Sequence, residues 1–299
     1  MGLEFVLRDA VELGFIWALL GFGVFISFRI LHFSDLSVDG TFAFGGAMMA
    51  ALLVEQVSPV LALLASFLAG ALAGLITGFL HTKAKIPGLL SGIITMTGLY
   101  SINLRVLSGR ATVSLLGVDT LFSWIHSFLP DRFLGTALMV GGLLILVAFA
   151  LYWFFGTELG CAIRATGSNP AMARAQGVAT DRMILIGLAL SNGLAALGGA
   201  LLAQQQGFAD INMGRGVIVI GIAAIIIGES LFGRRSFKNS LISVVLGTIT
   251  YYLLIGLAIS AGFYPNDLKL LSAVLVATIL ALPVLRKKVQ GGMRHAGTH

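Results

Sequence analysis

The sequence predicts an all-α polytopic membrane protein. Apolar residues make up 58% of its 299 residues and charged residues only 11%, against about 25% charged residues in an ordinary soluble domain. The mean hydropathy is +0.98. The apolar residues are gathered into runs bounded by charges, Gly or Pro. A soluble domain of this size could not keep that much apolar surface from water, whereas a lipid-facing exterior removes the limit.

Nine apolar runs are each interpreted as a transmembrane segment, because a span needs about 20 apolar residues, or fewer where the helix is short or broken. In chain order they are Val11–Leu31, Thr41–Val54, Val60–His81, Pro87–Leu104, Gly135–Phe155, Met183–Gln206, Gly216–Gly233, Ser240–Gly262 and Leu270–Leu285. The 38 glycines fit close packing between membrane helices. We expect a single transmembrane domain over residues 1–299.

The second run, Thr41–Val54, is too short to cross the bilayer upright as a regular helix. Polar residues lie directly before it, at Ser34, Asp35, Ser37 and Asp39. Irregular backbone at membrane depth is tolerated only where it is buried in protein. The sequence therefore predicts a broken second helix or a re-entrant entry to it.

The distribution of Lys and Arg predicts the orientation. With the C-terminus inside, 13 of the 19 basic residues fall on the inner side and 6 on the outer side. The positive-inside rule then places the N-terminus outside and the C-terminus inside, with residues 286–299 as a cytoplasmic tail. The basic residues form short clusters between apolar runs, so the net charge of +6 reflects topology, and nucleic-acid binding is excluded.

The inner loop at residues 156–182 is predicted to hold a two-turn helix from Asn169 to Gln176. The residues that predict it are Ser168 or Asn169 as the cap, Pro170 in the first turn and Gly177 as a left-handed stop. The next span is expected to be capped by Thr180 or Asp181.

A capped two-turn helix in a cytoplasmic loop suits docking to a cytosolic partner. Its alanines, Ala173 among them, are expected to form a small exposed face for that contact. The local chemistry leaves an alternative open, in which the segment is an ordinary interfacial connector.

The same loop resembles a known family. The run Arg164-Ala-Thr-Gly-Ser-Asn-Pro-Ala-Met-Ala-Arg-Ala-Gln-Gly-Val178 is similar to the coupling segment of ABC-importer permeases of the branched-chain amino acid and ribose type. The resemblance covers most of the chain and includes the runs Phe33–Gly46, Ser191–Ala200 and Ile227–Gly233. Within the family, Pro87–Asn103 looks closest to the tryptophan/tyrosine-type permease branch.

The resemblance implies a multi-pass subunit of the bacterial cytoplasmic (inner) membrane. An extracytoplasmic binding protein would deliver a small solute, an amino acid of aromatic type, to a pathway formed with a second permease copy. A separate ABC ATPase would bind ATP and magnesium, so no cofactor is expected in this chain. The residues implied to couple to the ATPase are Arg164, Gly167, Ser168, Asn169, Pro170, Ala173, Arg174 and Gly177. The chain has no Gly-x-x-x-x-Gly-Lys-Ser/Thr phosphate loop, which agrees with a transport subunit that is not an enzyme.

Polar residues inside the apolar runs are candidates for the translocation path. These are Ser91, Thr95, Tyr100 and Asn103 in the fourth run and Asn192 in the sixth. A buried Asn is costly to leave unpaired, so it should face protein or a water-filled path. Hydrogen bonding between helices is the alternative for each of them.

Three other functions remain as alternatives. An ion-coupled secondary transporter usually carries an ionisable group at the bilayer midplane, and no acid lies centrally in the nine runs, since Asp35 and Asp39 precede a span. A membrane enzyme is disfavoured, because the five histidines are scattered and Cys161 is the single cysteine. An ABC permease for a sugar or a nucleoside is the third alternative, since a binding protein would largely set selectivity.

Overall fold

The computed structural model describes residues 3–129 and 131–263, together with residues 270, 273–274 and 277–278. Within this part of the chain, seven helices are long and apolar enough to cross a membrane. They are α1 (Leu3–Val24) continued by the π-helical turn η1 (Phe25–Ile30), α2 (Ser37–Val54), α3 (Pro59–Thr82), α4 (Gly88–Val106), α6 (Arg132–Gly156), α9 (Thr180–Gln206) and α11 (Phe237–Ser260). The predicted helical membrane class is therefore confirmed.

The nine predicted spans are not reproduced as nine. The seventh run corresponds to α10 (Val217–Phe232), an apolar helix shorter than the spans. The ninth run, Leu270–Leu285, lies outside the continuously described residues, and the predicted tail at 286–299 lies outside the described residues altogether. The remaining elements are α5 (Leu121–Phe128), α7 (Glu158–Ser168), α8 (Pro170–Ala175) and a two-stranded antiparallel sheet of β1 (Thr112–Ser114) and β2 (Phe208–Asp210).

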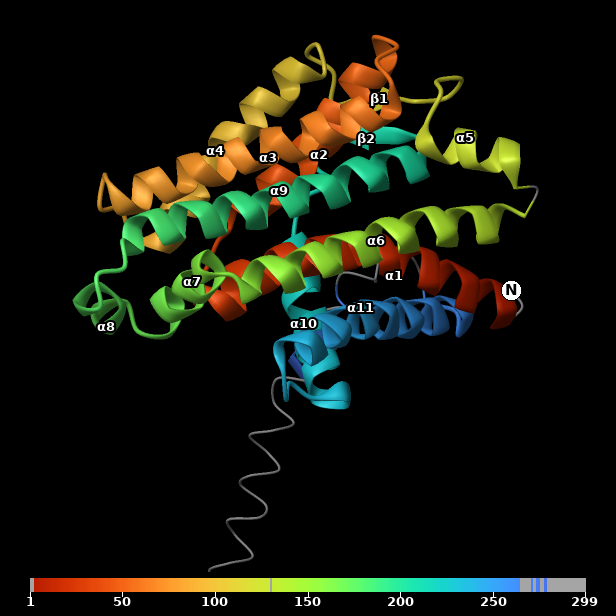
Figure 1. The fold of residues 1–299 in the computed structure, drawn as a ribbon. Coiled ribbons are helices and arrows are strands. Elements are labelled where there is room, and N and C mark those ends of the chain that lie inside the picture. The colour runs from red at the N-terminus through yellow and green to blue at the C-terminus, as the bar shows by residue number, and fades with distance from the viewer. Residues whose placement is uncertain (1–2, 130, 264–269, 271–272, 275–276, 279–299) are drawn as a thin grey trace, which may run out of the picture.

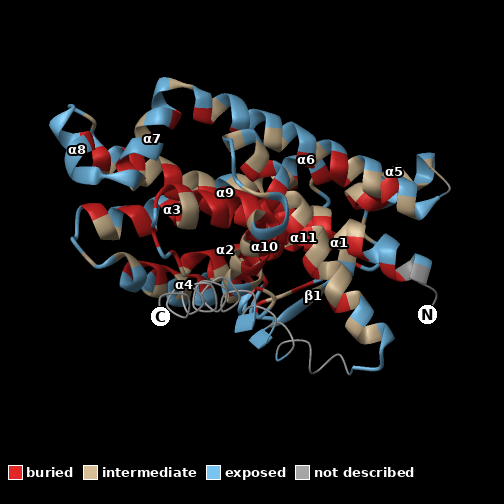
Figure 2. Ribbon diagram, turned by 90° about the horizontal axis from the view of Figure 1, so that it is seen from below, coloured by how far each residue is buried: buried red, intermediate tan, exposed pale blue. Residues whose placement is uncertain are grey.

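Helices α1 and α9 lie at the centre of the bundle (Figure 1). Helix α9 packs against α2 and α3 on one side and against α1 on the other, and α1 also contacts α6, α10 and α11. Helices α1, α2 and α9 are mostly buried, whereas most residues of α6 are exposed or half-buried (Figure 2). Large apolar side chains point outward from α3 and α6, which is the pattern expected of helices that face lipid.

Close contact between α2 and α9 depends on glycine. A Cβ on Gly45 would lie 1.9 Å from the carbonyl oxygen of Ala196, and a Cβ on Gly199 would lie 1.9 Å from that of Phe42. Neither separation is sterically possible, so each helix presents a glycine where the other helix's backbone comes nearest. Small residues allow such approach in membrane bundles, where tight packing replaces the hydrophobic effect.

The connections separate into two groups at opposite ends of the bundle. At one end, the ring of Phe33 lies 5.0 Å from that of His81, and the guanidinium of Arg164 lies over the ring of Phe237. At the other end, β1 pairs with β2, and Gln204 accepts a hydrogen bond from the backbone N–H of Leu121. The loops in each group are those predicted to lie on the same side of the membrane. Which of the two ends faces the cytoplasm stays a prediction.

The prediction of a broken second helix is wrong. Helix α2 is continuous over 18 residues and begins at Ser37, so the irregular backbone lies before it, at residues 31–36. His32 adopts a positive φ of 51° in this connection. The Asp35 carboxylate accepts a hydrogen bond from the backbone N–H of Ser37, which satisfies a free amide of the first turn. The polar residues before the second apolar run therefore belong to the start of α2 and do not break it.

Candidate functional site

The predicted short helix is present as α8. Asn169 caps it by accepting a 3.0 Å hydrogen bond from the backbone N–H of Met172, and Pro170 is its first residue. Gly177 follows it with a φ of +81°, the left-handed stop that the sequence predicts. Ser168 is not the cap, since it is the last residue of α7.

Helix α7 was not predicted, although its capping residue is visible in the sequence. Thr157 accepts a hydrogen bond from the backbone N–H of Gly160, and Glu158 places an acid in the first turn. Near its other end, a Cβ on Gly167 would lie 1.8 Å from the carbonyl oxygen of Ile30. Glycine at this position therefore lets α7 rest directly on the backbone of η1.

The expectation that Ala173 belongs to an exposed face is wrong. Ala173 is only 4% exposed and packs within the chain, whereas Met172 beside it is 63% exposed. Ala171 and Ala175 are also exposed. Residues two apart on an α-helix point about 200° apart around its axis, so Ala171 and Ala175 can be exposed while Ala173 between them is buried.

The predicted cap of α9 is also wrong. The N-cap residue is Ala179, which has no side chain able to cap. Thr180 and Asp181 instead bind Arg174: the Thr180 hydroxyl accepts a 2.7 Å hydrogen bond from Arg174 Nε, and the Asp181 carboxylate lies 3.6 Å from Arg174. Arg174 therefore holds α8 against the start of α9.

An ion pair joins this end of the bundle to α10. Arg29 on η1 donates two hydrogen bonds to the Glu229 carboxylate, from Nε to Oε1 at 2.9 Å and from the guanidinium NH2 to Oε2. The Glu229 side chain is 10% exposed and that of Arg29 is 32% exposed. The partner of Glu229 therefore lies on a helix distant in sequence and is not one of its sequence neighbours Arg234 and Arg235. A cleft of about 390 Å³ adjoins the pair and is lined also by His32, Cys161, Arg164 and Ser168.

A buried polar network surrounds Asn192, in the middle of α9. Its amide donates a 2.7 Å hydrogen bond to Asp35, and its carbonyl oxygen lies 3.1 Å from the Ser37 hydroxyl and 2.7 Å from the Thr41 hydroxyl. Asp35, which precedes the second apolar run in sequence, is 1% exposed, so an acid reaches the interior of the bundle. Burial raises the pKa of the Asp35 carboxyl, and hydrogen bonds from Ser37 and Asn192 oppose that shift.

The other polar candidates divide into two groups. Ser91 and Thr95 are buried, bond to carbonyls of their own helix, and Thr95 accepts a 2.9 Å hydrogen bond from Thr77 of α3. Thr95 therefore joins α4 to α3, as Asn192 joins α9 to α2, whereas Ser91 bonds only within its own helix. Tyr100 and Asn103 instead line a common cavity.

That cavity has a volume of about 420 Å³ and lies between α2, α4 and the connection before α10. Its lining residues are Asp39, Gly40, Ala43, Met96, Thr97, Tyr100, Asn103, Ile211, Gly214, Arg215 and Gly216. Two of these are charged, and sequence reasoning did not connect them. The sequence separates Asp39 from Arg215 by most of the chain, and only the fold brings them together.

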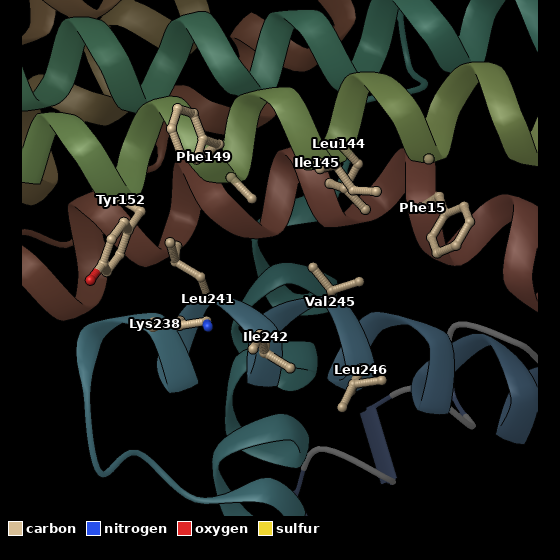
Figure 3. Close-up of a pocket in the computed structure, with 12 residues that line it drawn as sticks. Phe15, Leu144, Ile145, Phe149, Tyr152, Lys238, Leu241, Ile242, Val245 and Leu246 are labelled. Atoms are coloured by element: carbon tan, nitrogen blue, oxygen red, sulfur yellow. The ribbon is translucent and has the colours of Figure 1, made fainter.

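A larger groove of about 580 Å³ is of a different kind. It lies between α1, α6 and α11 and is lined by apolar side chains such as Phe15, Ile145 and Leu246 (Figure 3). Among the described residues that line it, only Tyr152 and Lys238 bring a polar side-chain group. It offers little to a polar solute, so the smaller cavity is the better candidate for the pathway.

Comparison with known proteins places this architecture in a family. Residues 7–283 match the family described as branched-chain amino acid transport system / permease component. The tyrosine transport system permease protein of Clostridioides difficile is 38% identical over 266 residues, 89% of this chain and 87% of that protein. The uncharacterized protein RP368 of Rickettsia prowazekii is 34% identical over 275 residues, 91% of this chain and 95% of that protein. The ribose import permease protein RbsC of Escherichia coli K12 is 27% identical over 261 residues, 84% of this chain and 76% of that protein. The chain therefore belongs to the branched-chain amino acid transport permease family, as a membrane-spanning permease subunit of an ABC transporter.

Proposed function

We propose that this permease subunit imports an amino acid with an aromatic side chain, delivered by an extracytoplasmic binding protein. Two copies of the chain form the pathway in the bacterial cytoplasmic (inner) membrane, and a separate ATPase binds ATP and magnesium. The family membership overturns the alternatives of an ion-coupled secondary transporter and of a membrane enzyme. Sugar and nucleoside solutes remain as alternatives.

The similarity to a tyrosine permease is the observation that carries this proposal. That relative is 38% identical over most of both chains, whereas the ribose permease is 27% identical. The difference favours an amino acid over a sugar as the solute.

The exposed side of helix α4 supports the proposal that a pathway and a second copy of the chain lie next to it. Thr97, Ser101 and Arg105 follow one another at intervals of four residues, and all three are exposed. An arginine is costly against lipid, so the part of this face that carries Arg105 should be covered by protein or water. The cavity lined by Tyr100 and Asn103 opens beside them.

Helices α7 and α8 support ATPase coupling. The contact of Gly167 with Ile30 and the hydrogen bond from Arg174 to Thr180 hold the two helices against η1 and α9. The exposed Met172, flanked by Ala171, is then the surface for the ATPase. Movement of α7 would reach Glu229 on α10 through η1 and Arg29.

The solute assignment is tested by transport. The chain is reconstituted in proteoliposomes with its ATPase and binding protein, and ATP-driven uptake of radiolabelled tyrosine, ribose and a nucleoside is compared. Uptake of tyrosine alone supports the proposal. Uptake of ribose or the nucleoside without tyrosine would replace it with the alternative solute.

The coupling surface needs a separate test. Met172→Asp should reduce ATPase co-purification at least tenfold, because it introduces a charge into an apolar contact. Leu116→Asp is the matched control, since Leu116 is 87% exposed in the connection between β1 and α5, away from α8. Equal ATPase recovery with both variants would contradict the coupling role.

A further inference from the structure

We infer that the 420 Å³ cavity between α2, α4 and residues 211–216 binds the zwitterionic head group of a neutral amino acid. The inference rests on the proposed function, because it names the solute chemistry of the pathway that this chain lines. The head group would be bound by Asn103, Asp39 and Arg215. Tyr100 belongs to the part of the cavity that would take the side chain of the amino acid.

Asn103 offers a free hydrogen-bond acceptor. It is 1% exposed, and its amide nitrogen donates to the carbonyl oxygen of Gly40 at 3.4 Å. A carbonyl oxygen can only accept, so this contact fixes the orientation of the amide. The Asn103 Oδ1 atom is buried and has no hydrogen-bond partner among the residues that the structure describes. A buried acceptor without a donor is destabilising, and a small shift of the Asn103 side chain toward the cavity would let an ammonium group there supply that donor.

Asp39 provides a fixed negative charge on the same cavity. Its Oδ2 accepts a 2.9 Å hydrogen bond from the backbone N–H of Gly216, and its Oδ1 accepts one of 2.9 Å from that of Ile218. These bonds hold the start of α10 on α2. A carboxylate has about four lone-pair sites, so two bonds leave it able to accept from an ammonium group as well.

Arg215 provides the complementary positive charge. It is exposed, lines the cavity, and forms no ion pair with any residue that the structure describes. Its position is set by Gly214, where a Cβ would lie 1.9 Å from the carbonyl oxygen of Asp39. A guanidinium held beside a cavity in this way matches a carboxylate, which it can bind through two parallel hydrogen bonds.

The rest of the lining suits an apolar or aromatic side chain. Ala43, Met96 and Ile211 are apolar, and Tyr100 adds an aromatic ring that is 45% exposed. The cavity volume lies within the range of about 300–1,000 Å³ typical of small-molecule sites. A zwitterion would bring a charge of opposite sign to both Asp39 and Arg215, whereas a neutral sugar would bring one to neither.

Equilibrium dialysis of the purified permease–ATPase complex with radiolabelled tyrosine, without the binding protein, tests the inference. Saturable binding is expected. Tyramine, which lacks the carboxylate, should displace tyrosine at least tenfold less well than unlabelled tyrosine does. Arg215→Gln should weaken tyrosine binding at least tenfold and make tyrosine and tyramine equivalent, because it removes the partner of the carboxylate. Arg215→Lys should restore part of the preference.

The control is Arg110→Gln, which removes an exposed arginine from the connection between α4 and β1, outside the cavity. It should leave tyrosine binding unchanged. If the wild-type transporter imports tyrosine but Arg215→Gln keeps full binding and the preference over tyramine, the site assignment is wrong while the proposed function stands. If the wild-type complex neither imports nor binds tyrosine, the proposed solute is wrong.

Discussion

The ion pair between Arg29 and Glu229 should contribute measurably to stability and couple η1 to α10. The change to make is a double-mutant cycle of Arg29→Gln, Glu229→Gln and the combined variant. Gln keeps much of the size of Glu and removes the charge, so the cycle isolates the interaction of the two side chains.

The burial of the two partners sets the expected magnitude. Exposed ion pairs contribute about 0–1 kcal/mol, and breaking a fully buried pair costs about 3–5 kcal/mol. Glu229 is 10% exposed and Arg29 is 32% exposed, so the pair lies between these limits and an interaction energy of about 2 kcal/mol is expected. Arg29→Gln should cost more than Glu229→Gln, because it leaves the more deeply buried charge without a partner.

The assay is reversible unfolding of the purified permease in mixed detergent micelles, together with ATP-driven uptake. The exposed pair of Glu4 and Arg8, at 2.7 Å on α1, is the matched control, and Glu4→Gln should change the free energy of unfolding by less than about 0.5 kcal/mol. An interaction energy between Arg29 and Glu229 of less than about 0.5 kcal/mol, the limit set for the control, would refute the reasoning.

Four further predictions concern other parts of the chain. Gly199→Ala places a methyl group against the Phe42 carbonyl oxygen, so the melting temperature in detergent should fall by an amount equivalent to about 1–3 kcal/mol; an unchanged melting temperature would show that α2 and α9 can separate freely. Asn169→Ala removes the α8 cap at a cost of about 1 kcal/mol, and hydrogen exchange should accelerate in α8 but not in α9. Because burial raises the pKa of Asp35, the folded state holds its proton more strongly than the unfolded chain does. The stabilising contribution of that proton is complete below the unfolded pKa of about 4 and is lost as pH rises through the folded pKa, so Asp35→Asn should show a smaller loss of stability over that window; identical pH profiles would contradict this. Finally, a cysteine at position 174 in a Cys161→Ser background should resist an impermeant thiol reagent added outside intact cells, and labelling there would reverse the predicted orientation.

Features that depend on local sequence were predictable. Eight of the nine apolar runs coincide with helices of the described structure, because apolar length alone selects such segments. The cap at Asn169, the proline after it and the left-handed Gly177 each act within one turn, so short-range chemistry determines α8. For the same reason α7 was open to prediction from Thr157 and Glu158.

Features that depend on distant contacts were not predictable in the same way. Glu229 had charged neighbours in sequence, yet the fold supplies Arg29 as its partner. Ala173 looked exposed because its neighbours are polar or small, and only the packing of α8 shows it to be buried. The cavity combines Asp39 with Arg215 through the contact of α2 with the start of α10, which no local pattern encodes.

The π-helical turn η1 limits which changes in chain length the protein can tolerate. In η1 the backbone N–H of Leu31 bonds the carbonyl oxygen of Ile26, five residues earlier, so the turn holds one residue more than an α-helical turn. A π-helical turn accommodates one extra residue locally, so deleting one residue here would close the turn to ordinary α-helical geometry. A deletion in the regular part of α1 would instead rotate the side chains beyond it by about 100° around the axis and turn Arg29 away from Glu229. A single-residue gap within α1 should therefore be more damaging than one within η1.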